Sequence, residues 1–185
     1  MEIKELSLPG LFMIIPDTHR DKRGYFFESF RGDMMTKFGL PATFIQDNQT
    51  KSVGGTLRGL HYQLKYPQGK LVRVSLGKIY DVAVDIRRGS PTFGHHWGTI
   101  LSDEVHMMMF IPEGFAHGFS VLSDTAIFQY KCTNIQHQED EYGLRWDDQE
   151  LNIDWKITNP ILSQRDSSLP FLKNIKDEHL PVYES

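Results

Sequence analysis

Cysteine is almost absent from this chain, which has one, Cys132, among its 185 residues. A single cysteine excludes a disulfide within the chain and is typical of proteins in a reducing compartment. No hydrophobic run approaches the roughly 20 residues of a membrane-spanning helix. The start, MEIKELSLPGLFMII, is too short and interrupted for a secretory signal. These features predict a cytoplasmic protein without membrane contacts, in which Cys132 is a small core residue.

A surplus of positive charge is also missing, because 20 Lys and Arg stand against 24 Asp and Glu, a net charge of −4. Proteins that bind nucleic acid or anionic membranes need a basic surface, so both classes are disfavoured and any basic site must be local. The chain has no P-loop, nucleophile elbow or dinucleotide-binding glycine fingerprint. We therefore expect it to work without a nucleotide or redox cofactor.

Short runs of strand-forming residues, separated by turn residues, follow one another along most of the chain. The clearest runs cover residues 58–63, 70–76, 79–86, 97–101, 106–111 and 126–132. A spacing of roughly ten residues between strands is typical of a sandwich or barrel. Only residues 31–38 and pieces near the C-terminus have weak helical character. The prediction is one all-β domain, residues 1–185, folded as an antiparallel β-barrel or a jelly roll with a few short helices.

Three side chains suited to proton chemistry lie on predicted strands. His61 stands in RGLHYQ, Lys70 begins the next run, KLVRVSL, and Tyr130 lies in AIFQYKC. The first two runs are predicted to form neighbouring strands. An imidazole takes up a proton near neutrality, an ammonium stabilises the negative charge left behind, and a phenol donates a proton. Each residue alone is more simply an ordinary core or surface side chain, but the combination indicates proton chemistry beside a carbonyl.

The alternation within 126–132 predicts where Tyr130 points. Tyr130 shares a strand face with Phe128 and Cys132, whereas Gln129 and Lys131 lie on the other face. Small and aromatic residues on the first face predict that Tyr130 points into the barrel. A core tyrosine that merely hydrogen-bonds its hydroxyl is an equally good explanation on this pattern alone.

A metal site is the weaker interpretation of the histidines. His117 follows a Pro-x-Gly turn and resembles a ligand in the second half of the cupin signature. The first half needs a His-x-His pair, whereas His61 is followed by Tyr-Gln-Leu, so the ligands would not converge on one ion. We expect no metal. Four other histidines are expected to be mostly solvated: His19, His106, His137 and His179.

Separated basic residues offer a site for a diphosphate. Arg23, Arg58, Lys70 and Arg73 lie in polar, glycine-bearing segments rather than in one charge run. Folding can bring such cations together, and arginine binds phosphate with two parallel hydrogen bonds. The alternative, that each is an ordinary exposed charge, is favoured for Arg73.

Ten short motifs, in order along the chain, resemble those of one enzyme family. They are RGYFFESF (23–30), FIQDNQT (44–50), LRGLHYQ (57–63), PQGKLVRV (67–74), DVAVDIR (81–87), SPTFG (90–94), IPEGFAHGF (111–119), YKCT (130–133), LRWDD (144–148) and LSQRD (162–166). Together they strongly resemble the dTDP-4-dehydrorhamnose 3,5-epimerase family, from about residue 6 to residue 170.

The resemblance implies a cupin-like jelly roll that lacks the metal and inverts C5 and then C3 of a 4-keto-6-deoxyhexose attached to dTDP. Both carbons flank the C4 ketone, so their protons are the acidic ones on the ring. By resemblance His61 is the general base, and Asp166 hydrogen-bonds it and fixes its tautomer. Tyr130 then reprotonates the opposite face, and Lys70 stabilises the enolate oxygen.

The resemblance also implies a binding site for the nucleotide and its phosphates. The matching residues are Arg23, Phe26, Glu28, Gln46, Asp47, Asn48, Arg58, His117, Glu141 and Arg165. In the family the Arg23–Glu28 segment is donated by a partner subunit. A homodimer with exchanged N-terminal segments is therefore implied.

One departure from the family pattern bears on specificity. After YKCT the family usually carries a tyrosine-containing stretch over the ligand, whereas Asn134–Gln138 here has no aromatic ring except the imidazole of His137. A single-carbon (C3 or C5) epimerase, or one acting on another 4-keto sugar nucleotide such as a heptose, is therefore an alternative. A sugar-nucleotide ketoisomerase and a non-catalytic sugar-binding jelly roll are further alternatives, and the combined acid–base residues argue against the last.

Overall fold

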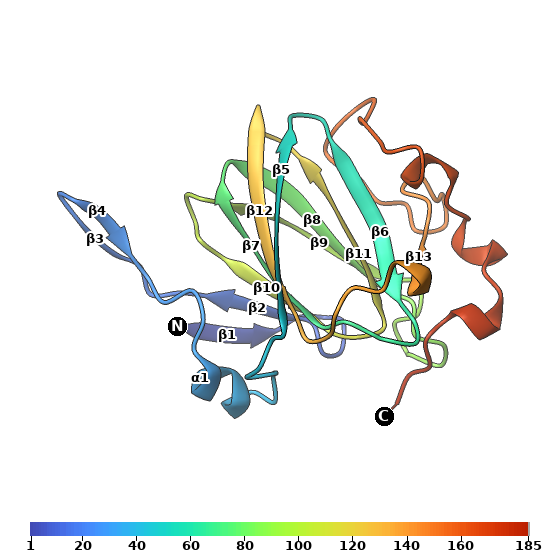
Figure 1. The fold of residues 1–185 in the computed structure, drawn as a ribbon, viewed down its shortest axis with the longest axis horizontal. Coiled ribbons are helices and arrows are strands. Elements are labelled where there is room, and N and C mark those ends of the chain that lie inside the picture. The colour runs from blue at the N-terminus through green and yellow to red at the C-terminus, as the bar shows by residue number, and fades with distance from the viewer. Residues whose placement is uncertain (185) are drawn as a thin grey trace.

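Two antiparallel sheets packed face to face form the body of the protein in the computed structural model, which describes residues 1–184 (Figure 1). The six-stranded sheet consists, in spatial order, of β1 (Glu2–Glu5), β2 (Phe12–Ile15), β10 (Met108–Ile111), β7 (Lys70–Leu76), β12 (Thr125–Cys132) and β5 (Gln46–Val53). The five-stranded sheet consists of β13 (Glu141–Gly143), β6 (Leu57–Gln63), β11 (Phe115–Val121), β8 (Lys78–Asp85) and β9 (His96–Ser102). The predicted all-β jelly roll is confirmed.

One predicted relation between strands is wrong. β6 and β7 follow each other in the chain but lie in different sheets, so they are not neighbours. The connection, residues 64–69, is longer than the tight turns that join paired strands. The carboxylate of Asp140 holds this connection in place, because it accepts hydrogen bonds from the backbone N–H groups of Lys65 and Tyr66 at 2.9 and 2.8 Å. His61 and Lys70 therefore approach the interior from opposite sheets.

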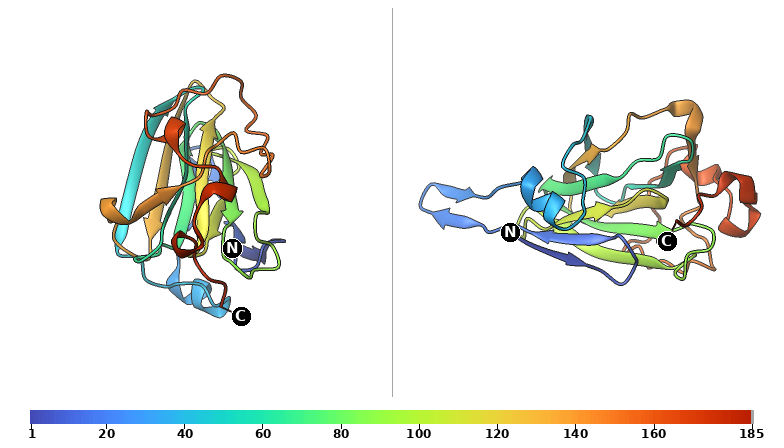
Figure 2. Two further views of the ribbon diagram at one scale, coloured as in Figure 1. Left: turned by 90° about the vertical axis from the view of Figure 1, so that its right-hand side faces the viewer. Right: turned by 90° about the horizontal axis from the view of Figure 1, so that it is seen from below.

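The interior between the sheets is apolar and includes Val72, Ala83 and Phe128. The other face of the five-stranded sheet is covered by the C-terminal part of the chain, where Trp155 packs among the valines of β8. Figure 2 shows this C-terminal segment, in red, at the end of the molecule opposite the N-terminal hairpin. Because both of its faces are covered, β8 is buried along nearly its whole length. Cys132 is fully buried, as predicted.

A buried charge network closes one end of the body. Asp85 is fully buried and accepts hydrogen bonds from Arg87 at 2.8 and 2.9 Å and from Ser90 at 2.6 Å. Burial alone would raise the pKa of Asp85, but these donors outweigh it and hold the pKa below its ordinary value. Arg87 also donates to the carbonyl of Pro9 and lies over the ring of Tyr183. The network thus connects both ends of the chain to the sheets.

A hairpin of β3 (His19–Asp21) and β4 (Gly24–Phe26), the arm, projects from the body (Figure 1). At its base the rings of Tyr25 and Phe27 pack on His106, with centroids 4.3 and 4.7 Å away. The expectation that His106 is solvated is wrong, because this packing leaves it 4% exposed. His106 also has a φ of 57°, outside the β region, so β10 begins two residues later than the predicted run.

Helices are few and short, as predicted. They are α1 (Gly32–Lys37), η1 (Gln138–Asp140), η2 (Asp166–Ser168), η3 (Leu172–Asn174) and η4 (Asp177–His179). Within residues 1–184 none of them has the length and apolar character needed to span a membrane.

Candidate active site

A cavity of about 280 Å³ lies between the two sheets. His61, Lys70, Tyr130 and Asp166, the predicted catalytic residues, all line it. His61 comes from β6 in one sheet, whereas Lys70 and Tyr130 come from β7 and β12 in the other. Asp166 begins the short helix η2. The cavity therefore combines residues that lie 105 positions apart in the chain.

A break in the regularity of β6 brings two functional side chains to one face. Arg58 and His61 are three residues apart, so a regular strand would send them to opposite faces. Both line the cavity because the register with β11 shifts where Gly59 meets Gly118. A Cβ on Gly59 would lie 2.5 Å from the Cα of Gly118, so this close approach requires glycine.

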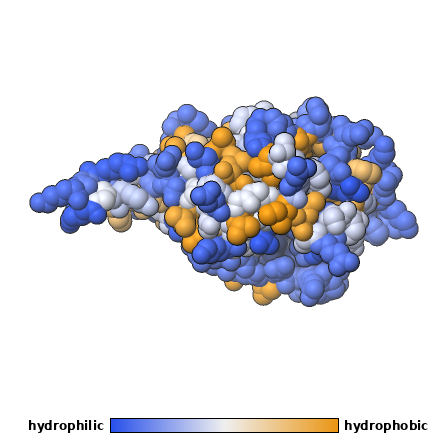
Figure 3. Space-filling view, turned by 90° about the horizontal axis from the view of Figure 1, so that it is seen from above, coloured by the Kyte–Doolittle hydropathy of each residue, from blue (hydrophilic) through white to orange (hydrophobic). Residues whose placement is uncertain are grey.

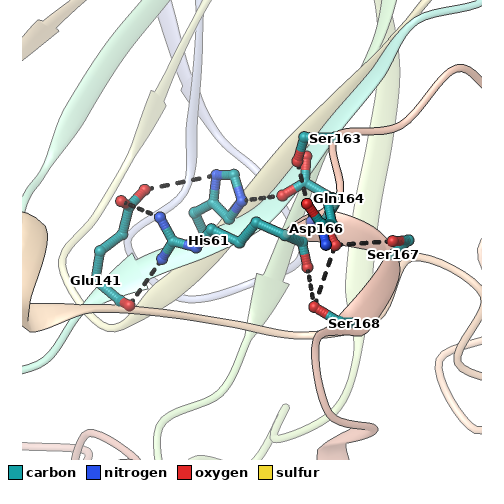
Figure 4. Close-up of polar contacts among 8 residues, drawn as sticks. His61, Glu141, Ser163, Gln164, Asp166, Ser167 and Ser168 are labelled. Carbon is teal, nitrogen blue, oxygen red and sulfur yellow. Dashed lines mark hydrogen bonds and ion pairs between the residues drawn. The ribbon is translucent and has the colours of Figure 1, made fainter.

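His61 and Asp166 form a hydrogen-bonded pair, with 2.6 Å between Nε2 and Oδ1 (Figure 4). Asp166 is 4% exposed, and its backbone N–H donates to the hydroxyl of Ser163 at 3.0 Å. Burial would raise the pKa of Asp166, but the contacts with His61 and Ser163 outweigh it, so the pKa lies below its ordinary value. An ionised Asp166 accepts only, so His61 carries a proton on Nε2 and leaves Nδ1 free as a base.

Glu141 faces that free nitrogen. Its Oε1 lies 3.7 Å from Nδ1 of His61, and its other oxygen accepts a hydrogen bond from Arg165 (Figure 4). Arg165 also donates to the backbone carbonyl of Glu141 at 2.8 Å. The imidazole of His61 thus lies between two carboxylates: Asp166 faces Nε2, and Glu141 faces Nδ1.

Burial shifts the pKa values of the two groups on the opposite sheet. Burial lowers the pKa of Lys70, and the nearby groups of Cys132, Glu141 and Asp81 oppose this shift. Burial raises the pKa of Tyr130, so its phenol keeps its proton at neutral pH. Tyr130 points inward, as predicted, and therefore presents a proton donor opposite the His61 base.

Five of the predicted binding residues also line the cavity: Asn48, Arg58, His117, Glu141 and Arg165. His117 lies opposite His61 on β11, is 8% exposed, and shares a 2.8 Å hydrogen bond with the fully buried Asp81. Arg58 donates to the hydroxyl of Ser52 at 3.1 Å. Arg58 and His117 supply polar groups beside the catalytic residues.

Two predicted binding residues on β5 lie outside the cavity lining. Gln46 supports the wall, because its amide donates to Asn48 and its carbonyl oxygen accepts the backbone N–H of Gln136. Asp47 also lies outside the cavity lining, so its expected contact with the substrate stays a prediction. Its carboxylate binds Lys131 at 2.8 Å in a groove on the outer face of the six-stranded sheet, since neighbouring residues of a strand point to opposite sides.

The predicted N-terminal contacts lie away from this chain's own cavity. Arg23 and Phe26 belong to the turn and second strand of the arm, and Glu28 follows it. Phe26 is 66% exposed, and Arg23 binds Asp21 beside it. Within one chain these residues are not brought to His61, which agrees with the expectation that they serve another subunit.

Several cavity residues were not predicted: Thr50, Gln63, Gln68, Phe119, Gln136 and Ser163. Most are neutral polar side chains, which carry no chemical signature of their own. Gln63, Gln68 and Ser163 nevertheless stand inside recognised motifs, so the motifs held the signal. Gln136 comes from the stretch that departs from the family pattern. His137 beside it stacks on Tyr66, with ring centroids 4.0 Å apart.

An antiparallel jelly roll with a histidine–carboxylate pair, a lysine and a tyrosine in one cavity has the features of a cupin-like sugar-nucleotide epimerase. The family model described as dTDP-4-dehydrorhamnose 3,5-epimerase matches residues 5–174. The chain belongs to this family, whose members are isomerases acting on carbohydrates.

Individual relatives agree with this assignment. A dTDP-4-dehydrorhamnose 3,5-epimerase from Methanothermobacter thermautotrophicus is 50% identical over 163 residues, which cover 86% of this chain and 88% of the relative. The crystal structure of an epimerase from Legionella pneumophila in complex with dTDP-4-keto-L-rhamnose is 45% identical, with a TM-score of 0.96, and covers 100% and 99% of the two chains. A 3′-monoepimerase from Streptomyces bikiniensis in complex with dTDP-quinovose is 33% identical, with a TM-score of 0.91, and covers 96% and 92%.

Proposed function

We propose that this protein inverts C5 and C3 of a dTDP-linked 4-keto-6-deoxyhexose, most simply dTDP-4-dehydro-6-deoxyglucose, by proton transfer through an enolate. The observation that carries the proposal is that His61 and Tyr130 line one cavity from opposite sheets. A base and an acid on opposite sides of a sugar can remove a proton from one face and return one to the other. That is the requirement for inversion at a carbon beside a ketone.

Each catalytic side chain has a role that its surroundings support. Asp166 fixes the tautomer that leaves Nδ1 of His61 free to take the proton. Lys70 supplies positive charge for the enolate oxygen, inside a cavity where such charge acts more strongly than in water. Tyr130, whose pKa is raised by burial, holds the proton that the carbon receives.

The nucleotide and phosphates of the substrate are proposed to lie along Arg58, His117 and Asn48 at the same cavity. Arginine can bind a diphosphate with two parallel hydrogen bonds. The relative from Legionella pneumophila supports this proposal, because it holds dTDP-4-keto-L-rhamnose on a fold that covers the whole of this chain.

The proposed working form is a homodimer in which each arm completes the cavity of the partner. The arm extends away from its own body, and its Phe26 is 66% exposed (Figure 1). Seen from above, the arm is mainly hydrophilic, whereas apolar residues gather on the body beside it (Figure 3). Exposed apolar surface of this kind suits contact with another protein surface.

A single-carbon epimerase is the second candidate. The similarity to a 3′-monoepimerase, at 33% identity, shows that this fold also occurs in an enzyme with that activity. Gln136, which replaces the usual aromatic stretch, lines the cavity and is the observation that favours this candidate. Double inversion is preferred because the relative at 50% identity is a 3,5-epimerase.

The test is proton NMR of dTDP-4-dehydro-6-deoxyglucose incubated with the protein in D₂O, with EDTA present because no metal is expected. Deuterium at C5 and C3 together with the L-rhamno configuration supports double inversion, and inversion at one carbon supports the second candidate. His61→Ala should abolish both exchange and inversion, a loss of about 10²–10⁴-fold. Tyr130→Phe should exchange deuterium yet give little epimer. Inversion by Tyr130→Phe at the wild-type rate would disprove the role of Tyr130 as acid.

A further inference from the structure

Double inversion at one site requires that the base lose the proton from the first inversion before the second begins. Each inversion leaves His61 with an extra proton and Tyr130 without one, on the proposed assignment of base and acid. The same base cannot act on the second carbon until it has lost that proton. Returning the proton to carbon would only reverse the first step, so a different exit is needed.

We propose that Glu141 is this exit: it takes the proton from Nδ1 of His61 and passes it to water, resetting the base between the two inversions. The inference rests on the proposed function, because it assigns a role within the double epimerisation. Glu141 was expected only to bind substrate. On this proposal it acts through His61 and is a positioning and relay residue.

The geometry identifies Nδ1 of His61 as the nitrogen that receives the proton and must lose it again. Asp166 accepts a hydrogen bond from the N–H at Nε2, with 2.6 Å between Nε2 and Oδ1. The proton taken from carbon therefore arrives at Nδ1. The Oε1 of Glu141 lies 3.7 Å from Nδ1, and no hydrogen bond joins them while the ring is neutral, because both atoms are acceptors. Once Nδ1 is protonated, the imidazolium and the carboxylate attract each other, and a displacement of less than 1 Å brings them into hydrogen-bond range.

The surroundings of Glu141 hold its side chain between His61 and solvent. Glu141 lies on β13, and its backbone pairs with Gln63 of β6, which fixes it beside His61. Arg165 donates to its second oxygen, Oε2, which leaves Oε1 directed at Nδ1 of His61. The Glu141 side chain is 14% exposed and that of Arg165 is 42% exposed, so the pair leads from the cavity towards solvent.

The protons balance over each inversion. His61 takes one proton from carbon, and Tyr130 gives one to the opposite face of that carbon. His61 then passes its proton through Glu141 to water, and water returns a proton to Tyr130. No oxidant or reductant takes part.

The experiment compares single-turnover time courses of wild type and Glu141→Gln, with each carbon followed by NMR after rapid quenching. The glutamine keeps the size of the side chain and an oxygen for Arg165, but it does not take up a proton at neutral pH. The first inversion should stay within a few-fold of wild type, whereas the second should slow by about 10²-fold. Glu139→Gln is the matched control, because its exposed carboxylate binds His137 and should leave both rates unchanged.

A second arm uses Glu141→Ala with added formate. Formate is a small carboxylate that can take up a proton as Glu141 does, so it should restore the second inversion in proportion to its concentration. Equal slowing of both inversions in Glu141→Gln, without formate rescue of Glu141→Ala, would show that Glu141 only binds substrate. Wild-type rates in Glu141→Gln would also overturn the proposal. If wild-type protein inverts neither carbon, the proposed function fails instead, so the two failures are distinguishable.

Discussion

At the scale of single residues, Lys70 is the group whose charge depends most directly on the cavity. Burial disfavours its ammonium, and the negative groups nearby only partly compensate, so its pKa is lowered. The charged form is the one that stabilises an enolate. Activity should therefore fall as pH rises through a Lys70 pKa that lies below the ordinary lysine value of about 10.4.

The prediction for Lys70 is a change in the shape of the pH profile. Lys70→Arg keeps a charge that does not titrate in this range, so any remaining activity should lack the alkaline fall. Lys70→Met should have a low kcat where wild-type Lys70 is charged, and its profile should also lack the fall. The measurement is kcat/KM against pH, with Lys51→Met, an exposed lysine on β5, as the control that keeps the wild-type profile. An unchanged alkaline fall in Lys70→Arg would assign it to another group.

The chemical identity of a residue decided how well its place could be predicted. His61, Lys70, Tyr130 and Asp166 were recognised because each has a proton or charge to exchange, and all four line one cavity. A motif match does not say which way each residue faces, and strand alternation puts Asp47 on the outer face of β5. Asn48 faces the cavity, so its neighbour on β5 must face outward.

At the scale of elements, the arm depends on one buried histidine. Tyr25 and Phe27 pack on His106, and Arg20 donates to Nε2 of His106 at 3.5 Å, which requires that nitrogen to be unprotonated. Burial lowers the pKa of His106, and the charge of Arg20 lowers it further, whereas Asp103 opposes them. Because the folded pKa lies below the ordinary value of about 6.5, this packing is intact above that pH and weakens as pH falls below it.

His106→Ala should therefore release the arm at neutral pH, as we expect acid to do in the wild type. Hydrogen exchange in residues 19–27 should rise about tenfold or more, while exchange in β7 and β12 stays slow. His19→Ala is the control, because His19 is exposed on the arm itself and contributes no such packing. Unchanged exchange in His106→Ala would mean that the backbone of the hairpin holds the arm without this ring.

Strands were easier to predict than their partners. The run 70–76 coincides with β7, and 126–132 differs from β12 by one residue, because alternation and β-forming residues are local signals. Sheet membership is set by pairing between distant segments, such as β7 with β10 and β12. The expectation that His61 and Lys70 lie on neighbouring strands failed for that reason. The error matters, because only opposite sheets put them across the cavity from each other.

At the scale of the whole molecule, the chain separates its proposed binding residues into two places. His61 and Tyr130 lie inside the body, whereas Arg23 and Phe26 lie on an arm that extends away from it (Figure 1). A symmetric dimer with exchanged arms would bring both sets together twice. This arrangement can be tested without knowing the geometry of the interface.

The test mixes two defective chains, one with Arg23→Ala and Phe26→Ala in the arm and one with His61→Ala in the body. If arms are exchanged, a mixed dimer contains one cavity with both defects and one complete cavity. Half of the dimers in an equal, freely assembling mixture are mixed, so activity should reach about a quarter of wild type. The matched control mixes His61→Ala with Tyr130→Phe chains. Both of these defects lie in the body, so every cavity keeps one defect and activity should not return. Activity no higher than the average of the two parents in the first mixture, despite dimers seen by light scattering, would mean that each arm serves its own chain.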